Sequence, residues 1–146
     1  MNTPKRRKYA EILHPQARED LAFTARQHSF VQARKKVIIT ARKAGGPQGI
    51  DQAVEKLNNL PGIKGSAVGI PANVSTEAEI VRLVEHVKKI EGKLDILVAN
   101  AGATWGSSFE DAPDHASAKI LDLNVRGVFL LAQKWVETWR ERCWKC

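Results

Sequence analysis

Two amide-bearing segments stand out in the apolar parts of this 146-residue sequence. Asn100, Ala101 and Gly102 follow a short apolar run, and small residues there let the backbone pass close to a bound ligand. Asn124 lies within a largely apolar helical stretch, where a buried amide must find hydrogen-bonding partners. These residues predict a ligand site at a strand end, completed by a helical amide. Turn chemistry at 100–102 and a structural amide at 124 remain open alternatives.

Elements that could position these residues alternate from residue 36 onward, as is typical of βα units on a parallel sheet. Short apolar runs predict strands at 37–41, 66–70 and 94–99. Helical spacing of apolar residues predicts helices near 50–60, 76–90 and 114–142. Thr76 and Glu79 have the spacing of a capping box before the second helix. The third helix is apolar enough to predict burial on more than one side. The expected core is therefore βαβαβα.

Charge divides the sequence. The net charge of +7 comes from 23 Lys+Arg and 16 Asp+Glu, and the first 43 residues hold 11 of the basic but only 3 of the acidic residues. We therefore expect residues 1–29 to be a basic segment, either disordered or helical, and residues 30–146 to be a partial domain. No stretch approaches the ~18 apolar residues that a membrane span needs, so we expect a soluble, cytoplasmic protein with no membrane partner.

Four landmarks resemble the short-chain dehydrogenase/reductase family. Ala99 to Gly102 is similar to its Asn-Asn-Ala-Gly motif, and Asn124, 22 residues after Gly102, begins an Asn-Val pair. The 37–41 run with Arg42 resembles the family's second strand, and residues 72–75 resemble its Asp-Val-Ser. The resemblance covers about residues 30–134 and is nearest to the 3-oxoacyl-carrier-protein reductase type. It implies an α/β fold, an incomplete Rossmann-type doubly wound parallel sheet with an atypical N-terminal segment.

The resemblance also implies NADP as the cofactor. Arg42, at the end of a strand, would pair with the 2′-phosphate, although a solvated loop arginine is the alternative. Asn73, with Val74 beside it, stands where the family has an Asp that binds the adenine amino group; a plain turn is the alternative. Residues 100–102 would line the dinucleotide. Asn124 corresponds to the asparagine of a catalytic Asn-Ser-Tyr-Lys set, where it holds a water of the proton relay.

Two family motifs are absent from the sequence. The Thr-Gly-x-x-x-Gly-x-Gly motif would fall near residues 16–23, which contain no glycine, and the glycines at 45–49 do not fit as a displaced version. The one tyrosine, Tyr9, is followed four residues later by Leu13 and not by the family's Lys. The family reaction is NADPH-dependent reduction of a small-molecule carbonyl, such as a 3-oxoacyl thioester, to an alcohol. We expect this chain alone to bind NADPH poorly or not at all and to be catalytically incompetent.

Three further features of the sequence bear on its function. The 114–139 helix resembles the one that pairs subunits in the family, so a non-catalytic module that pairs with a full-length relative or a second copy is the alternative. The basic run at residues 5–8 lacks interleaved aromatic residues, which favours a solvated tail over nucleic-acid binding. Cys143 and Cys146 have Cys-x-x-Cys spacing, but no second ligand cluster accompanies them, so we predict no metal site.

Overall fold

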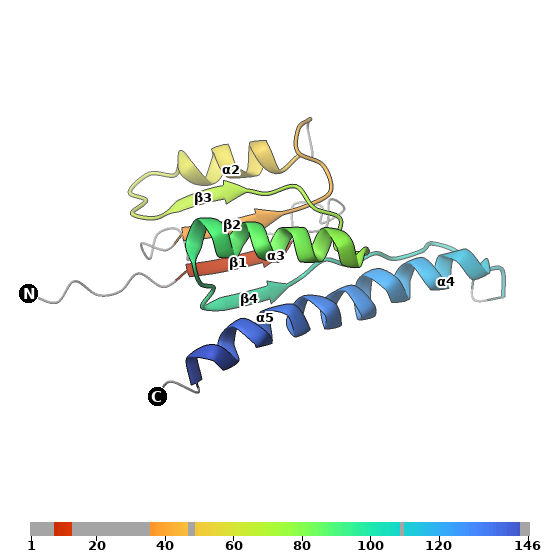
Figure 1. Cartoon of the computed structure of the whole chain (residues 1–146). Coiled ribbons are helices and arrows are strands. Elements are labelled where there is room, and N and C mark those ends of the chain that lie inside the picture. Colours follow the sequence, from red (N-terminus) through yellow and green to blue (C-terminus); the bar gives the residue numbers. More distant parts are fainter. Residues whose placement is uncertain (1–7, 13–35, 47–48, 109, 144–146) are drawn as a thin grey trace, which may run out of the picture.

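The computed structural model describes residues 8–12, 36–46, 49–108 and 110–143. Its strands form one parallel sheet in the order β3-β2-β1-β4. The strands are β1 (Lys8–Ile12), β2 (Lys36–Thr40), β3 (Ser66–Gly69) and β4 (Ile96–Ala99). The chain runs outward from β1 to β3 and then crosses back to place β4 on the other side of β1 (Figure 1). This reversal is the arrangement of a doubly wound sheet, and it confirms the predicted fold class.

The helices agree with the predicted pattern, with one subdivision. They are α2 (Ile50–Asn58), α3 (Glu77–Glu91), α4 (Asp114–Leu121), the π-helical segment η1 (Asp122–Gly127) and α5 (Val128–Cys143). In Figure 1, α3 and α5 lie side by side, and α2 runs along β3. The predicted third helix is therefore α4, η1 and α5 in succession. No helix in the described part of the chain is both long and apolar enough to cross a membrane.

Both faces of the sheet are covered by apolar side chains. Ile38 packs in a cluster with the buried faces of α3 and α5, whereas its neighbours Val37 and Ile39 pack in a second cluster with α2. Successive strand residues point to opposite faces, so a continuous apolar strand supplies both clusters. The larger cluster contains Ile80, Val84, Val87, Leu94, Leu131 and Trp135. This packing fixes the helices that carry the candidate site.

β1 corrects the predicted domain boundary. Residues 8–12 pair with both β2 and β4, with Ala10 opposite Ile38 on one side and Leu97 on the other. The prediction of a separate, disordered or helical segment at 1–29 is therefore wrong for these five residues. Central strands of parallel sheets usually read as apolar runs, whereas Lys8 and Glu11 interrupt this one. Residues 1–7 and 13–29 lie outside the described part.

The C-terminal helical region is buried on one side only. Leu121, Val125 and Phe129 are 58%, 59% and 67% exposed, which contradicts the predicted burial on more than one side. The opposite side is held by Trp135, which is 1% exposed, and by Trp139, whose Nε1 donates to the Leu94 carbonyl at 2.8 Å. The apolar content of the sequence therefore reflects one buried face and one exposed apolar face.

Candidate functional site

The predicted site residues follow the carboxyl ends of three strands. Arg42 comes two residues after β2, Asn73 four residues after β3, and Asn100 directly after β4. Because the strands are parallel, these positions lie along one edge of the sheet, where open α/β sheets bind their ligands. Arg42 and Asn100 are exposed, whereas Ala101 is 7% exposed and belongs to the larger core cluster. The structure thus gathers the predicted residues at one edge.

Asn124 makes a two-point contact with the loop that follows β4. The Ala103 N–H donates to Asn124 Oδ1 at 2.7 Å, and Asn124 Nδ2 donates to the Ala103 carbonyl at 2.9 Å. A Cβ placed on Gly102 would lie 3.4 Å from the same Oδ1, so the loop and the helix are closely packed there. The amide that was predicted to need partners therefore finds them in the backbone at 103, next to the predicted 100–102 segment.

Asn73 closes the turn between β3 and α3. Its Oδ1 accepts from the Ser75 N–H at 3.2 Å and from the Ser75 hydroxyl at 2.8 Å. Its carbonyl accepts from the N–H and from the hydroxyl of Thr76, each at 3.2 Å. An adenine amino group would therefore compete with Ser75 for the Asn73 oxygen. Val74 as a whole is only 4% exposed and belongs to the larger core cluster, so the structure offers no accessible surface for the predicted cofactor contact at Val74.

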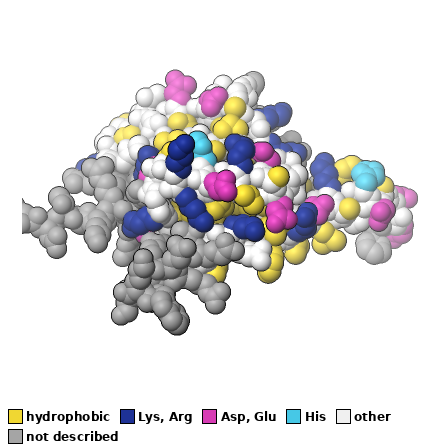
Figure 2. Space-filling model, viewed as in Figure 1, with side chains coloured by type: hydrophobic (Ala, Val, Ile, Leu, Met, Phe, Trp, Pro, Cys, Tyr) yellow, Lys and Arg dark blue, Asp and Glu magenta, His cyan; other side chains and the backbone are white. Residues whose placement is uncertain are grey.

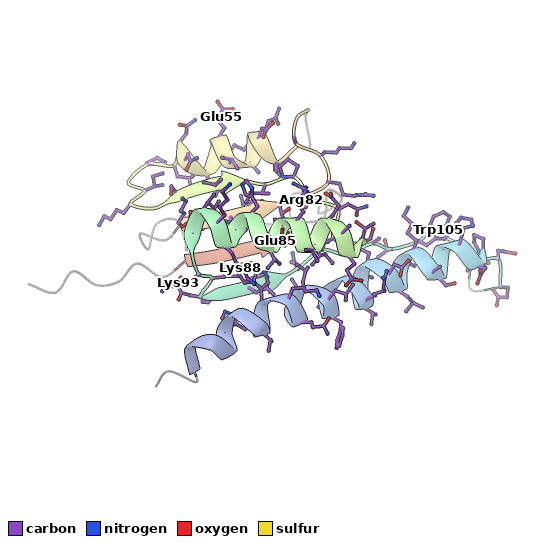
Figure 3. The ribbon with its side chains drawn as sticks, viewed as in Figure 1. Glu55, Arg82, Glu85, Lys88, Lys93 and Trp105 are labelled. Atoms are coloured by element: carbon purple, nitrogen blue, oxygen red, sulfur yellow. The ribbon has the colours of Figure 1, made fainter. Side chains whose placement is uncertain are left out.

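The predicted capping box does not form. Thr76 is the N-cap of α3 but makes no side-chain cap hydrogen bond, because its hydroxyl donates back to Asn73. Glu79 instead accepts from Arg82 at 2.7 and 3.1 Å, and Arg82 also donates to the Pro71 carbonyl at 2.6 Å. The hydrogen bonds from Arg82 lower the pKa of the exposed Glu79 carboxyl. Arg82, which Figure 3 shows on α3, thereby ties this helix to the segment just before Asn73.

An aromatic cluster beyond the site was missed from the sequence. The Trp105 and His115 rings meet edge to face, with centroids 5.3 Å apart, and Lys119 Nζ lies 5.7 Å from the Trp105 centroid. Figure 3 shows Trp105 beside α4, away from the sheet. The cluster holds the segment after the site against α4. Only the i, i+4 spacing of His115 and Lys119 hinted at it, and nothing in the sequence pairs them with Trp105.

The described residues also bear on the other features that the sequence singles out. In the ranges that the structure covers, no three His, Cys, Asp or Glu side chains are grouped so as to hold a metal ion. Figure 2 shows Lys and Arg side chains interleaved with Asp and Glu on the face that carries α3, and not a surface of one sign. The predicted position of the glycine motif at 16–23, the basic run at 5–8 and the Cys143/Cys146 pair lie outside the described side chains.

The fold is that of a doubly wound parallel α/β protein, and comparison with known proteins assigns it to a family. The family model for short chain dehydrogenases matches residues 24–144. The chain therefore belongs to the short-chain dehydrogenase family, which confirms the resemblance seen in the sequence. The match extends beyond the 30–134 segment on which that resemblance was based.

Individual relatives agree with this assignment. The rhamnolipids biosynthesis 3-oxoacyl-[acyl-carrier-protein] reductase of Pseudomonas aeruginosa is 40% identical over 70 residues, which is 48% of this chain and 27% of the relative. The 5-keto-D-gluconate 5-reductase of Escherichia coli is 38% identical over 95 residues, 65% of this chain and 34% of the relative. The structure of the Pseudomonas aeruginosa RhlG/NADP active-site complex superposes with a TM-score of 0.70 at 28% identity, covering 88% of this chain and 46% of that one. The chain thus spans about a quarter to a third of the length of these curated relatives and about half of the solved one.

Proposed function

We propose that this chain supplies the cofactor edge of an NADPH-dependent short-chain reductase that reduces a small-molecule carbonyl to an alcohol. The observation that carries the proposal is the Asn124–Ala103 contact at the carboxyl edge of three parallel strands. A 3-oxoacyl thioester is the proposed substrate class, because the relative named as a 3-oxoacyl-[acyl-carrier-protein] reductase is 40% identical over the matched segment. We also propose a cytoplasmic location.

The adenosine half of NADP fits the residues present at this edge. Arg42 is exposed directly beyond β2, where its guanidinium could pair with a 2′-phosphate. The 73–75 turn offers the amide of Asn73 for the adenine ring, provided that Ser75 gives up one hydrogen bond. Backbone at 100–102 would contact the rest of the nucleotide, since small residues there allow a close approach. These are the proposed cofactor-binding residues.

The pyrophosphate and nicotinamide ends fit less well. The chain has no glycine before Gly45, so the segment after β1 lacks the residues that let a backbone approach a pyrophosphate. It also lacks a Lys four residues after its one tyrosine. When bound, NADPH would supply a hydride to the carbonyl carbon. Because the usual proton donor is missing, we propose that this chain alone does not catalyse the reaction.

Asn124 is the proposed catalytic residue of the family set. Both atoms of its amide are engaged by the Ala103 backbone, so the side chain holds the loop after β4 in place. The contact with Ala103 uses one of the two lone pairs on Oδ1 and one of the two N–H groups on Nδ2, so the amide keeps one acceptor and one donor position for a relay water while it fixes the edge. A proton relay would further need the Tyr and Lys that this sequence does not supply.

Nicotinamide fluorescence tests the cofactor part of the proposal. We expect titration of the purified chain with NADPH to give no enhancement at micromolar concentration, because the pyrophosphate cradle is missing. Arg42→Ala should leave that result unchanged. Micromolar binding by the chain alone, lost in Arg42→Ala, would overturn the proposed incompetence while keeping the proposed edge.

A second function, a non-catalytic module that pairs through residues 114–139, is favoured by one observation. The exposed apolar side chains of the C-terminal helical region form a stripe that consists of Leu121, Val125, Phe129 and Val136. Exposed apolar stripes of this kind favour association. A second copy or a full-length relative is the proposed partner.

Size measurement separates this function from the first. Light scattering of the chain with and without a full-length relative should give a defined complex, and Phe129→Ser should abolish it. The exposed polar substitution Gln133→Ser is the matched control and should leave the complex intact. If the chain stays monomeric both alone and with the relative, or aggregates without a defined size, the hypothesis of a pairing module is rejected.

A further inference from the structure

Gly127, the last residue of η1, is packed against backbone and not against side chains. A Cβ placed on it would lie 2.4 Å from the Val74 carbonyl oxygen and 3.2 Å from that of Asp122. Real Cβ atoms essentially never approach other heavy atoms within 3.0 Å. Because the nearest atom belongs to the backbone, no rotation of a side chain can relieve the overlap. The close contact between η1 and the turn at 74 therefore requires glycine.

The requirement is one of space and not of backbone conformation. Among the described residues, the glycines with positive φ are Gly46, Gly62 and Gly92, and Gly127 is not one of them. Glycine inside a helix is less favourable than alanine by about 1 kcal/mol. Gly106, by contrast, has open space around its Cβ position. Gly127 thus stands where helix propensity alone would favour alanine, and the contact with Val74 explains it.

That contact joins the two loops of the candidate site. The Val74 carbonyl belongs to the turn that Asn73 closes on Ser75. Three residues before Gly127, Asn124 holds the Ala103 backbone. η1 therefore touches the loop after β3 with one residue and the loop after β4 with another. π-helical segments within helices often occur at functional sites, and here the segment carries both contacts.

We propose that Gly127 is a positioning residue of the candidate site. Its missing side chain lets η1 contact the Val74 carbonyl, and this contact keeps Asn124 on the Ala103 backbone. The two loops then move as one unit. That this unit holds a cofactor rests on the proposed function; the contact itself does not.

Amide hydrogen exchange of the purified chain tests the proposal. In Gly127→Ala, the overlap with Val74 should displace η1, so the Ala103 amide should exchange at least about tenfold faster, whereas the Val84 amide in α3 keeps its rate. Gly106→Ala is the matched control and should change neither rate. Equal acceleration at both amides would indicate general destabilisation, and an Ala103 rate within about twofold of the parent would indicate no coupling. Either result overturns the proposal.

A second variant shows whether Gly127 acts through Asn124. Asn124→Ala should accelerate exchange at Ala103 by itself, and adding Gly127→Ala should then have no further effect. A further acceleration in the double variant would mean that Gly127 acts by another route, against the proposal.

If Gly127→Ala does not fold, the unsubstituted parent chain still tests the proposal. In the parent, the free energies of the opening reactions that expose the Ala103 and Ser75 amides to exchange should then fall with denaturant concentration at the same slope, because η1 joins their loops. Separate opening of the two would overturn the proposal. None of these readouts involves a cofactor, so failure of NADPH binding and failure of the coupling are distinguishable.

Discussion

Two asparagines in this molecule make the same contact at different places. Asn58 donates to the Ala67 carbonyl at 3.0 Å and accepts from the Ala67 N–H at 2.8 Å. Asn124 does the same with Ala103 at 2.9 and 2.7 Å. The chemistry and the distances are nearly identical, so the contact alone does not distinguish a functional amide from a structural one.

Topology makes the distinction. Ala67 lies in β3, the strand at one end of the sheet order, so Asn58 occupies backbone groups that would otherwise face outward from a strand edge. Ala103 lies in the loop beyond the carboxyl end of β4, beside the predicted ligand segment. A paired amide therefore suggests function only when it lies at the edge where parallel strands end.

The largest expected effect comes from a substitution in the core that anchors the helix following Asn124. Trp135 is 1% exposed at the centre of the larger cluster, on the helix that continues from η1. Trp135→Ala should lower the free energy of unfolding by about 3–5 kcal/mol, because it leaves a cavity. Chemical denaturation measures this. Val136→Ala, at a 41% exposed position, is the control and should cost less than about 0.5 kcal/mol. Similar losses in both variants would contradict the packing described.

An intermediate effect compares the two amides directly. Asn58→Ala and Asn124→Ala should each lower the free energy of unfolding by about 1–2 kcal/mol, since each leaves two backbone groups without these partners. Exchange should accelerate at Ala67 in the first variant and at Ala103 in the second. The exposed amide variants Gln52→Ala and Gln133→Ala are the controls. If either single variant loses exchange protection at both Ala67 and Ala103, the two contacts are not independent, and this account is contradicted.

The smallest effect concerns pH. Arg82 lowers the pKa of Glu79 in the folded protein, so this pair stabilises the fold at pH values above the ordinary Glu pKa of about 4.3. That contribution is lost as the pH falls through the lowered pKa. A side-chain NMR titration should give a midpoint for Glu79 below that of an ordinary Glu, and Arg82→Gln should raise it. An unchanged midpoint in Arg82→Gln would contradict the pairing.

Much of the fold could be predicted because its signals are local. The β-branched run before Arg42 and the helical spacing before Gly92 each specify one element, and both elements form within a residue or two of the predicted bounds. β1 could not be predicted in this way, because its pattern is short and interrupted by charge. Its place is set by pairing with β2 and β4.

The candidate site was predicted in its positions but not in its contacts. The sequence indicated that Asn124 needs partners and that residues 100–102 end a strand. It contained no signal that Asn124 would bond to Ala103, since the two are brought together by tertiary packing. The contact of Gly127 with Val74 was equally hidden, because a glycine in a helical pattern does not reveal what lies against it.

Binding of 2′,5′-ADP, the adenosine half of NADP, tests most directly whether the carboxyl edge of the sheet is the nucleotide edge. In NMR titration of the chain at millimolar ligand, the account predicts amide shifts at Arg42, Ser75 and Ala103 and none at Lys36 or Lys93, which lie at the opposite ends of the strands. Arg42→Ala should remove the shifts. Shifts centred on Lys36 and Lys93, or no shifts at all, would contradict it.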